Sequence, residues 1–144
     1  MIDSRNLNEL HPRVRALAEV FLDACKAAGV DVLVTSTYRD HEAQDALYAK
    51  GRTAPGAKVT NSKGGQSLHN FRVAFDVVPR VDGKLLWTTS GATGKLWENI
   101  GALGEYVGLE WGGRWKTFPD YPHFQFTGGL SLADFQAGET LEEK

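Results

Sequence analysis

The sequence has little sulfur and little excess charge. Only Cys25 among its 144 residues is a cysteine, which excludes an intramolecular disulfide and a metal site built from several thiolates. The 16 Lys and Arg residues nearly balance the 18 Asp and Glu residues, and the formal net charge is −2. Because no basic run is present either, we expect neither a nucleic-acid partner nor binding to an anionic membrane. Any metal ion must be held by histidine and carboxylate.

Long apolar segments are also missing. No stretch has the length needed to cross a bilayer, and residues 1–6 lack the apolar core of a signal peptide. The sequence therefore predicts a protein made in the cytoplasm without a signal peptide. If its substrate lies outside the membrane, another protein must permeabilise that membrane.

The composition that remains is that of one globular domain. Hydrophobic residues make up 42% of the chain and charged residues 24%, and no linker or internal repeat divides it. Residues 1–130 are predicted to form this domain. Residues 131–144 are predicted to be a C-terminal tail, either a short polar helix or a frayed end, without a domain of its own.

Hydrophobic spacing predicts an α+β fold, a small antiparallel sheet with flanking helices. The pair Asp82-Gly83 favours a hairpin turn, because its residues tolerate positive φ angles. Glycines 101 and 104 are unfavourable inside the last predicted helix. Helices are expected at residues 12–28, 40–51 and 93–107, and strands at 30–37, 71–78, 109–111 and 123–126.

Two of the four histidines lie in segments rich in polar and aromatic residues. His69 follows a long loop at residues 52–66, and His123 follows Tyr121-Pro122. His11 and His41 each stand at a predicted helix start and are assigned no chemistry. Two imidazoles and one carboxylate form a known catalytic zinc set, because three protein ligands leave a fourth position for water.

Asp76 lies within an otherwise apolar strand, where an unpaired carboxylate costs several kcal/mol to bury. A metal ion would stabilise it, and so would a buried arginine. His69 or His123, taken alone, is as easily read as a hydrogen-bonded structural residue. The residues by themselves leave the metal site and the salt bridge open as alternatives.

Two motifs resemble a known family. Ser67-x-His69-x-x-Arg72-x-Ala74-x-Asp76 is similar to the SxHxxGxAxD motif of D-alanyl-D-alanine carboxypeptidase-like zinc peptidases, and Asp120-x-x-His123 resembles their second motif. The segment from Trp111-Gly112-Gly113 to Phe124 looks most like the phage L-alanyl-D-glutamate endopeptidases. The resemblance spans roughly residues 30–126 and implies the fold shared with the zinc domain of hedgehog proteins. Arg72 stands at the usual glycine, so the backbone there cannot require a glycine-only conformation.

The resemblance implies a role for each matching residue. Asp120 would be the general base, although an aspartate at this position can also simply cap the turn at Tyr121-Pro122. Arg39 would stabilise the oxyanion, although it could instead pair with Asp40 or Glu42 on the surface. Ser67 would bind substrate or orient a ligand, and Gln125 would line the substrate cleft. The zinc ligands implied are His69, Asp76 and His123.

The function implied is hydrolysis of the peptide stem of bacterial peptidoglycan by a monomeric zinc enzyme. The first hypothesis is cleavage of the L-alanyl-D-glutamate bond by a phage endolysin, which reaches the wall after membrane permeabilisation. A D,D-carboxypeptidase or dipeptidase of the same family is the alternative, and Arg72 or Arg114 could then bind the terminal carboxylate. A third possibility is a zinc-stabilised cell-wall-binding domain without activity. Under the first two hypotheses, residues 1–130 are the catalytic domain.

Overall fold

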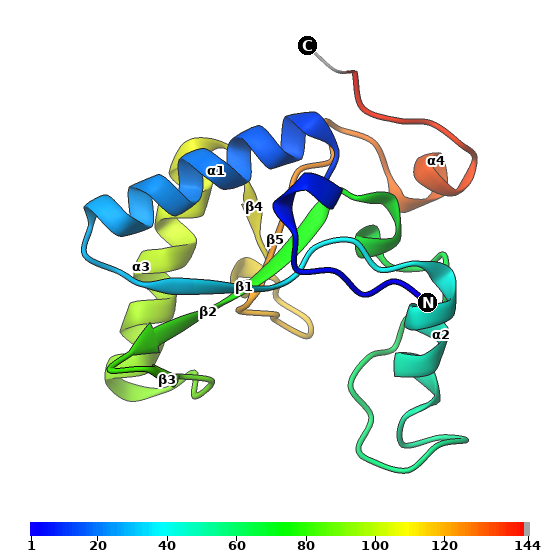
Figure 1. Ribbon diagram of the computed structural model, residues 1–144, viewed down its shortest axis with the longest axis horizontal. Helices are drawn as coiled ribbons and strands as arrows, with labels where there is room; N and C mark the ends of the chain where they lie inside the picture. The colour runs from blue at the N-terminus through cyan, green and yellow to red at the C-terminus, as the bar shows by residue number, and fades with distance from the viewer. Residues whose placement is uncertain (143–144) are drawn as a thin grey trace.

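A computed structural model describes residues 1–142, and the last two residues of the predicted tail, 143 and 144, lie outside the described part. The described chain combines helices with one antiparallel sheet, which confirms the predicted α+β class (Figure 1). The helices are α1 (Pro12–Ala27), α2 (His41–Ala49), α3 (Gly91–Val107) and α4 (Leu132–Gln136), and the strands are β1 (Val32–Ser36), β2 (Ala74–Val81), β3 (Lys84–Leu85), β4 (Glu110–Trp111) and β5 (His123–Gln125).

The sheet has the strand order β1-β2-β5-β4, with β3 joined to the far end of β2. Each of these pairings is antiparallel. The register sets Asp76 of β2 opposite Ser36 on one side and His123 on the other. Alternate residues of a strand point to opposite faces, so Asp76 lies on the face opposite that of Phe75.

Helices α1 and α3 cover the face that carries Phe75 and Phe124. Phe21 of α1 lies with its ring centroid 4.7 Å from that of Phe124 and 6.0 Å from that of Phe75. Helix α1 begins with Pro12 at its first turn and is followed by Gly29 with φ 77°, as the sequence predicts. The other face carries Asp76 and the polar side chains around it that are described below, and we call it the polar face.

The glycines of α3 have a packing role that outweighs their poor helix propensity. A Cβ at Gly101 would lie 2.2 Å from the Trp111 ring, and one at Gly104 would lie 2.4 Å from the Phe124 ring. The absence of side chains therefore lets the helix backbone approach the aromatic rings of β4 and β5. The predicted helix at 93–107 is confirmed and begins at Gly91.

The predicted strand at residues 71–78 is wrong at its start. A 3₁₀ turn, η2 (Leu68–Phe71), and a left-handed residue, Arg72, with φ 65° and ψ 24°, come first, so β2 begins at Ala74. The predicted hairpin is confirmed, because Asp82 and Gly83 have φ 52° and 78°.

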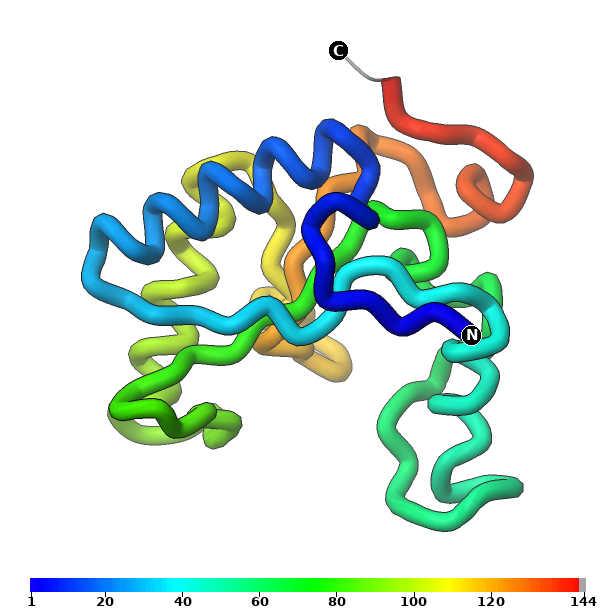
Figure 2. Tube along the Cα trace, in the orientation of Figure 1, coloured from blue at the N-terminus to red at the C-terminus, as the bar shows by residue number. Residues whose placement is uncertain are grey.

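Both ends of the described chain are packed against other segments of the protein. The N-terminal segment runs along the turn after β1, where the amide of Ser4 donates to the carbonyl of Tyr38 and the amide of Asp40 to that of Ile2 (Figure 2). At the other end Ser131 caps α4, and the buried Phe135 ring stacks on Phe71 at a centroid distance of 5.7 Å. No described helix is both long and apolar enough to span a membrane.

Candidate metal centre

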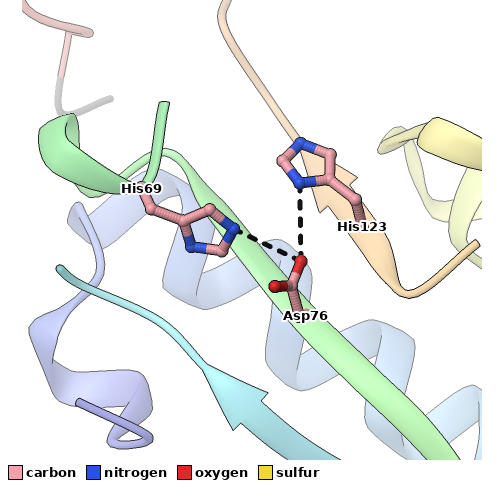
Figure 3. Close-up of side chains that lie close together, drawn as sticks. All are labelled: His69, Asp76 and His123. Carbon is pink, nitrogen blue, oxygen red and sulfur yellow. Dashed lines mark ion pairs between the residues drawn. The ribbon is translucent and has the colours of Figure 1, made fainter. Parts of the chain in front are cut away.

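Three side chains from distant parts of the chain converge on the polar face of the sheet (Figure 3). Nε2 of His69 lies 3.3 Å from Oδ1 of Asp76, and Nδ1 of His123 lies 3.4 Å from the same oxygen. One ligand atom from each residue falls within 4.8 Å of the others. The predicted set His69, Asp76 and His123 is thus brought together.

Local structure explains how each donor is placed. Asp76 and His123 are cross-strand partners on β2 and β5. His69 lies in η2, whose first turn is capped by the Ser67 side chain. The carbonyl of His69 accepts a hydrogen bond from the amide of Arg39. The turn therefore ties His69 to the segment after β1 and holds it beside the central strand.

The outer nitrogen of each imidazole already has a hydrogen-bond partner. Nδ1 of His69 donates to the carbonyl of Thr37 at 2.9 Å, and Nε2 of His123 donates to Oε1 of Gln125 at 2.7 Å. A neutral imidazole carries one N–H, so the inner nitrogens present lone pairs to Asp76. Such partners behind a metal-binding histidine fix its tautomer.

The donors fit a divalent cation. Oδ1 of Asp76 is buried and has no hydrogen-bond partner, while two nitrogen lone pairs point toward it. Three such electron-rich atoms repel one another unless a cation lies between them. Ligand bonds of about 2.0–2.1 Å at tetrahedral angles place neighbouring donors about 3.3 Å apart, close to the separations found between Asp76 and each histidine.

Asp120 stands next to this cluster without joining it. Its Oδ2 lies 4.0 Å from Nδ1 of His123, and its side chain is 48% exposed. The segment that carries Asp120 is held by Gly112, whose carbonyl accepts a hydrogen bond from the amide of Asp120 at 2.9 Å. A Cβ at Gly112 would lie 2.4 Å from the Asp120 carbonyl oxygen, so this position needs glycine for close packing.

Arg39 is held by polar partners at the edge of the same cavity. Its two terminal nitrogens donate to Oε1 of Gln44 at 2.8 Å and to Oγ of Ser36 at 3.0 Å. Its Nε lies 3.6 Å from Asp3, and the side chain is only 12% exposed. The surface pairing with Asp40 or Glu42 is not formed, and those carboxylates instead lie 3.8 and 3.4 Å from the N-terminal ammonium.

The charges in the cluster shift the acidities of its members. Burial alone would raise the pKa of Asp76, but in the metal-free cluster attraction to the imidazoles in their protonated form outweighs burial and holds that pKa far below its usual value. For His123, burial would lower the pKa, but Asp76 and Asp120 outweigh this and raise it. Partial removal from water, together with repulsion from Asp76, raises the pKa of Asp120 despite the opposing attraction of His123. Asp120 is therefore a better proton acceptor than an ordinary aspartate.

The cluster lies in a cavity of about 520 Å³. Ser67 and Gln125 both line it, although both ends of the Gln125 amide are bound by protein groups, His123 and Glu110. Substrate contact by these two residues stays a prediction. The whole lining comprises Arg39, Leu47, Val59, Thr60, Ser62, Gln66, Ser67, Leu68, His69, Asp76, Trp115, Asp120, His123 and Gln125.

The two arginines considered for a terminal carboxylate lie elsewhere. Arg72 pairs with Glu9 at 2.8 Å and stacks on the Tyr38 ring at 3.7 Å, and Arg114 pairs with Glu105 at 3.0 Å. Neither lines the cavity. Arg72 is left-handed, a conformation that suits glycine best but remains open to other residues at a cost of about 1–2 kcal/mol.

Sequence reasoning missed two groups that support the cluster. Gln44, fully buried, holds Arg39 and also donates to the carbonyl of Ser62. It stands three and four residues before Leu47 and Tyr48 in the predicted helix at 40–51, so helical spacing places it on the same side as these apolar residues, and that is the signal that could have revealed it. Glu110 accepts from Gln125, and no local pattern pointed to that contact.

A donor triad with an uncoordinated carboxylate beside it, in an open cavity, defines a hydrolase-type metal centre. Comparison with known proteins narrows this class. Residues 60–126 match the family described as D-alanyl-D-alanine carboxypeptidase. The chain is 37% identical over 123 residues to the peptidoglycan L-alanyl-D-glutamate endopeptidase CwlK of Bacillus subtilis strain 168, covering 82% of this chain and 74% of that protein. The chain therefore belongs to the D-alanyl-D-alanine carboxypeptidase family of peptidases.

Two further similarities concern a phage protein and a solved structure. The chain is 29% identical over 122 residues to the L-alanyl-D-glutamate peptidase of Listeria phage A118, covering 84% of this chain but only 39% of the phage protein. The crystal structure of the Serratia marcescens L-Ala D-Glu endopeptidase ChiX superposes with a TM-score of 0.63 at 24% identity, covering 91% of this chain and 87% of that one. The latter shows that the fold is shared.

Proposed function

We propose that this protein is a zinc-dependent peptidase that hydrolyses the L-alanyl-D-glutamate bond in the peptide stem of bacterial peptidoglycan. The observation that carries the proposal is the convergence of His69, Asp76 and His123, within the segment that matches the peptidase family. The 37% identity to a peptidoglycan L-alanyl-D-glutamate endopeptidase supports the choice of bond.

The proposed zinc ligands are Nε2 of His69, Oδ1 of Asp76 and Nδ1 of His123. Two imidazoles and one carboxylate, without cysteine, are donors that suit zinc and leave a coordination position for water. A zinc ion held there would polarise the scissile carbonyl and lower the pKa of a bound water to about 7. The partners of the outer nitrogens, the Thr37 carbonyl and Gln125, would keep both histidines oriented.

Asp120 is proposed to move the proton. Its half-exposed carboxylate lies beside His123 but outside the donor triad, and its raised pKa favours accepting a proton from the attacking water. The same carboxyl would then deliver that proton to the leaving amine. This position beside the donors is the main argument against a binding domain without activity, because a site that only binds zinc has no use for a base.

Arg39 is proposed to stabilise the negative charge that develops on the carbonyl oxygen. Its guanidinium is permanently charged, and Gln44 and Ser36 hold it at the cavity. Ser67 caps the turn that carries His69, which supports a role in orienting that ligand. A substrate contact by Ser67 would be made from the same place on the cavity wall.

A D,D-carboxypeptidase is less well supported than the endopeptidase. Such an enzyme must bind a free carboxylate, and Arg72 and Arg114 are paired with glutamates outside the cavity. The phage relative supports a biological role as an endolysin that reaches the wall after membrane permeabilisation. Monomeric action stays a prediction.

Product analysis tests the proposal. The purified protein is incubated with peptidoglycan, with and without a chelator, and the products are analysed by mass spectrometry. We expect new muramyl-L-alanine ends and new D-glutamate amino termini, their loss with the chelator, and their return with added zinc. Release of D-alanine alone would support the carboxypeptidase. Tight zinc binding with no cleavage would support the binding domain.

A further inference from the structure

A chain of hydrogen bonds runs from the surface to the back of His123. Nε2 of His123 donates to Oε1 of Gln125 at 2.7 Å, and Nε2 of Gln125 donates to Oε2 of Glu110 at 3.0 Å. The same glutamate oxygen accepts from Nε1 of Trp115 at 3.0 Å. Trp115 also lies against His123, with 5.1 Å between the ring centroids. Glu110 thus anchors both the amide and the indole that contact His123.

The carboxylate of Glu110, at the outer end of these hydrogen bonds, decides which group donates and which accepts in each of them. An ionised carboxylate only accepts hydrogen bonds, so Glu110 selects the NH₂ group of the Gln125 amide. The amide oxygen must then face His123, and the imidazole must carry its proton on Nε2. The lone pair of a neutral His123 is consequently on Nδ1, the atom that faces Asp76 at 3.4 Å.

We propose that Glu110 is a positioning residue that acts through Gln125 to present Nδ1 of His123 to the metal ion. The inference rests on the proposed zinc site and adds to it a determinant on another strand. Glu110 and Gln125 are cross-strand partners on β4 and β5, so the sheet register holds the two side chains together. Without the carboxylate, an amide can present either its oxygen or its nitrogen to the imidazole.

The two histidines are therefore oriented in different ways. His69 is held by a main-chain carbonyl, that of Thr37, which no side-chain substitution removes. His123 is held by side chains, so its tautomer depends on residues that can be exchanged. Reversing the polarity of the Glu110–Gln125–His123 chain should consequently impair metal binding without touching a ligand.

The test is to reverse the donor–acceptor order of these hydrogen bonds with one substitution and to restore it with a second. In Glu110→Lys the ammonium is a donor, which turns the Gln125 oxygen outward and the NH₂ group toward His123. We expect zinc affinity, measured by competition with a chelator, to fall about 10- to 100-fold. In Glu110→Lys/Gln125→Glu the new carboxylate at position 125 accepts hydrogen bonds from the new ammonium at position 110 and from Nε2 of His123. Zinc affinity should then return to within about threefold of that of the original protein. Glu110→Gln keeps an acceptor oxygen, which the Trp115 N–H would hold at the same place, and should retain affinity.

Nitrogen-15 NMR of the histidines in the metal-free protein supplies a second readout. At a pH above the raised pKa of His123, where its imidazole is neutral, the ring should carry its proton on Nε2 in the original and doubly substituted proteins, and on Nδ1 in Glu110→Lys. Glu105→Lys, which makes the same charge change at a surface ion pair outside the cavity, should alter neither measurement. Thermal unfolding identifies any variant that has lost its fold, and Glu110→Gln provides a near-isosteric comparison.

Unchanged zinc affinity and tautomer in folded Glu110→Lys would overturn the inference, as would a double variant that stays as weak as the single one. Failure of the proposed function looks different. In that case the unmodified protein itself binds no zinc or leaves peptidoglycan intact. If the unmodified protein binds zinc and cleaves, while every folded variant equals it, only the positioning role of Glu110 is lost.

Discussion

Asp76 and His123 face each other across the central pair of strands, with the carboxylate oxygen 3.4 Å from Nδ1 of the imidazole. The register between β2 and β5 creates this contact, and η2 brings His69 to the same oxygen at 3.3 Å. A metal site assembled in this way depends on the sheet as much as on the ligands.

Replacing a ligand should remove metal and activity together. In His123→Ala one of three donors is lost, and we expect zinc content, measured by elemental analysis after dialysis, to fall to background along with peptidoglycan cleavage. His11→Ala is a suitable control, because His11 lies outside the cavity. Cleavage at the original rate by metal-depleted His123→Ala would contradict the assignment.

Replacing the proposed base should separate chemistry from metal binding. Asp120→Asn keeps the size of the side chain but removes its ability to accept the proton, and we expect kcat to fall by a factor of about 10² to 10⁴. Zinc content should stay at one ion per chain. A variant that retains most of its kcat would show that the proton is accepted elsewhere.

Activity should fall on the acid side because of the same carboxylate. The pKa of Asp120 is raised above the ordinary value of 3.8, so the ionised form needed to accept a proton is populated above that raised pKa and lost as the pH falls through it. We expect kcat/KM to decrease tenfold per pH unit below it. Zinc content is checked at each pH, since protonation of His123 competes with the metal. The same acid limb in the residual activity of Asp120→Asn would assign it to another group.

The close contact between α3 and Trp111 should make one glycine irreplaceable. Helix propensity alone predicts that Gly101→Ala stabilises the protein by about 0.5–1 kcal/mol. The added Cβ would lie 2.2 Å from the Trp111 ring, so we expect destabilisation by about 1–3 kcal/mol in urea unfolding. Ala102→Ser, at the neighbouring exposed position, should change stability by less than about 0.5 kcal/mol. An increase in stability for Gly101→Ala would mean that the ring can move aside.

The C-terminal segment should matter for stability although no proposed site residue lies in it. Phe135 is 4% exposed and stacks on Phe71, and Gln136 donates to the carbonyl of Gly65 at 2.7 Å. Phe135→Ala should destabilise the protein by about 3 kcal/mol in the same unfolding assay, because it opens a cavity next to η2. Gln136→Ala should cost about 1 kcal/mol. Full stability of a chain ending at residue 130 would show that the segment is dispensable.

Much of the fold was predictable because its signals are local. The helix that begins at Pro12, the Asp82-Gly83 turn and the central strand follow from spacing and turn chemistry. The start of β2 was misplaced, because Arg72 takes a left-handed conformation that its residue type does not suggest. Its side chain packs on Tyr38 and pairs with Glu9, contacts that a pattern of neighbours does not reveal.

The sequence by itself determined which donors are available. With one cysteine and four histidines, a transition-metal site had to use imidazole and carboxylate, and Asp76 in an apolar strand was visible as an anomaly. The tertiary structure alone decided which nitrogen each histidine presents, because those choices depend on the Thr37 carbonyl and on Gln125 with Glu110. A hydrogen bond forms between atoms a few ångströms apart, and only strand register and loop packing bring residues this distant in the chain to that separation.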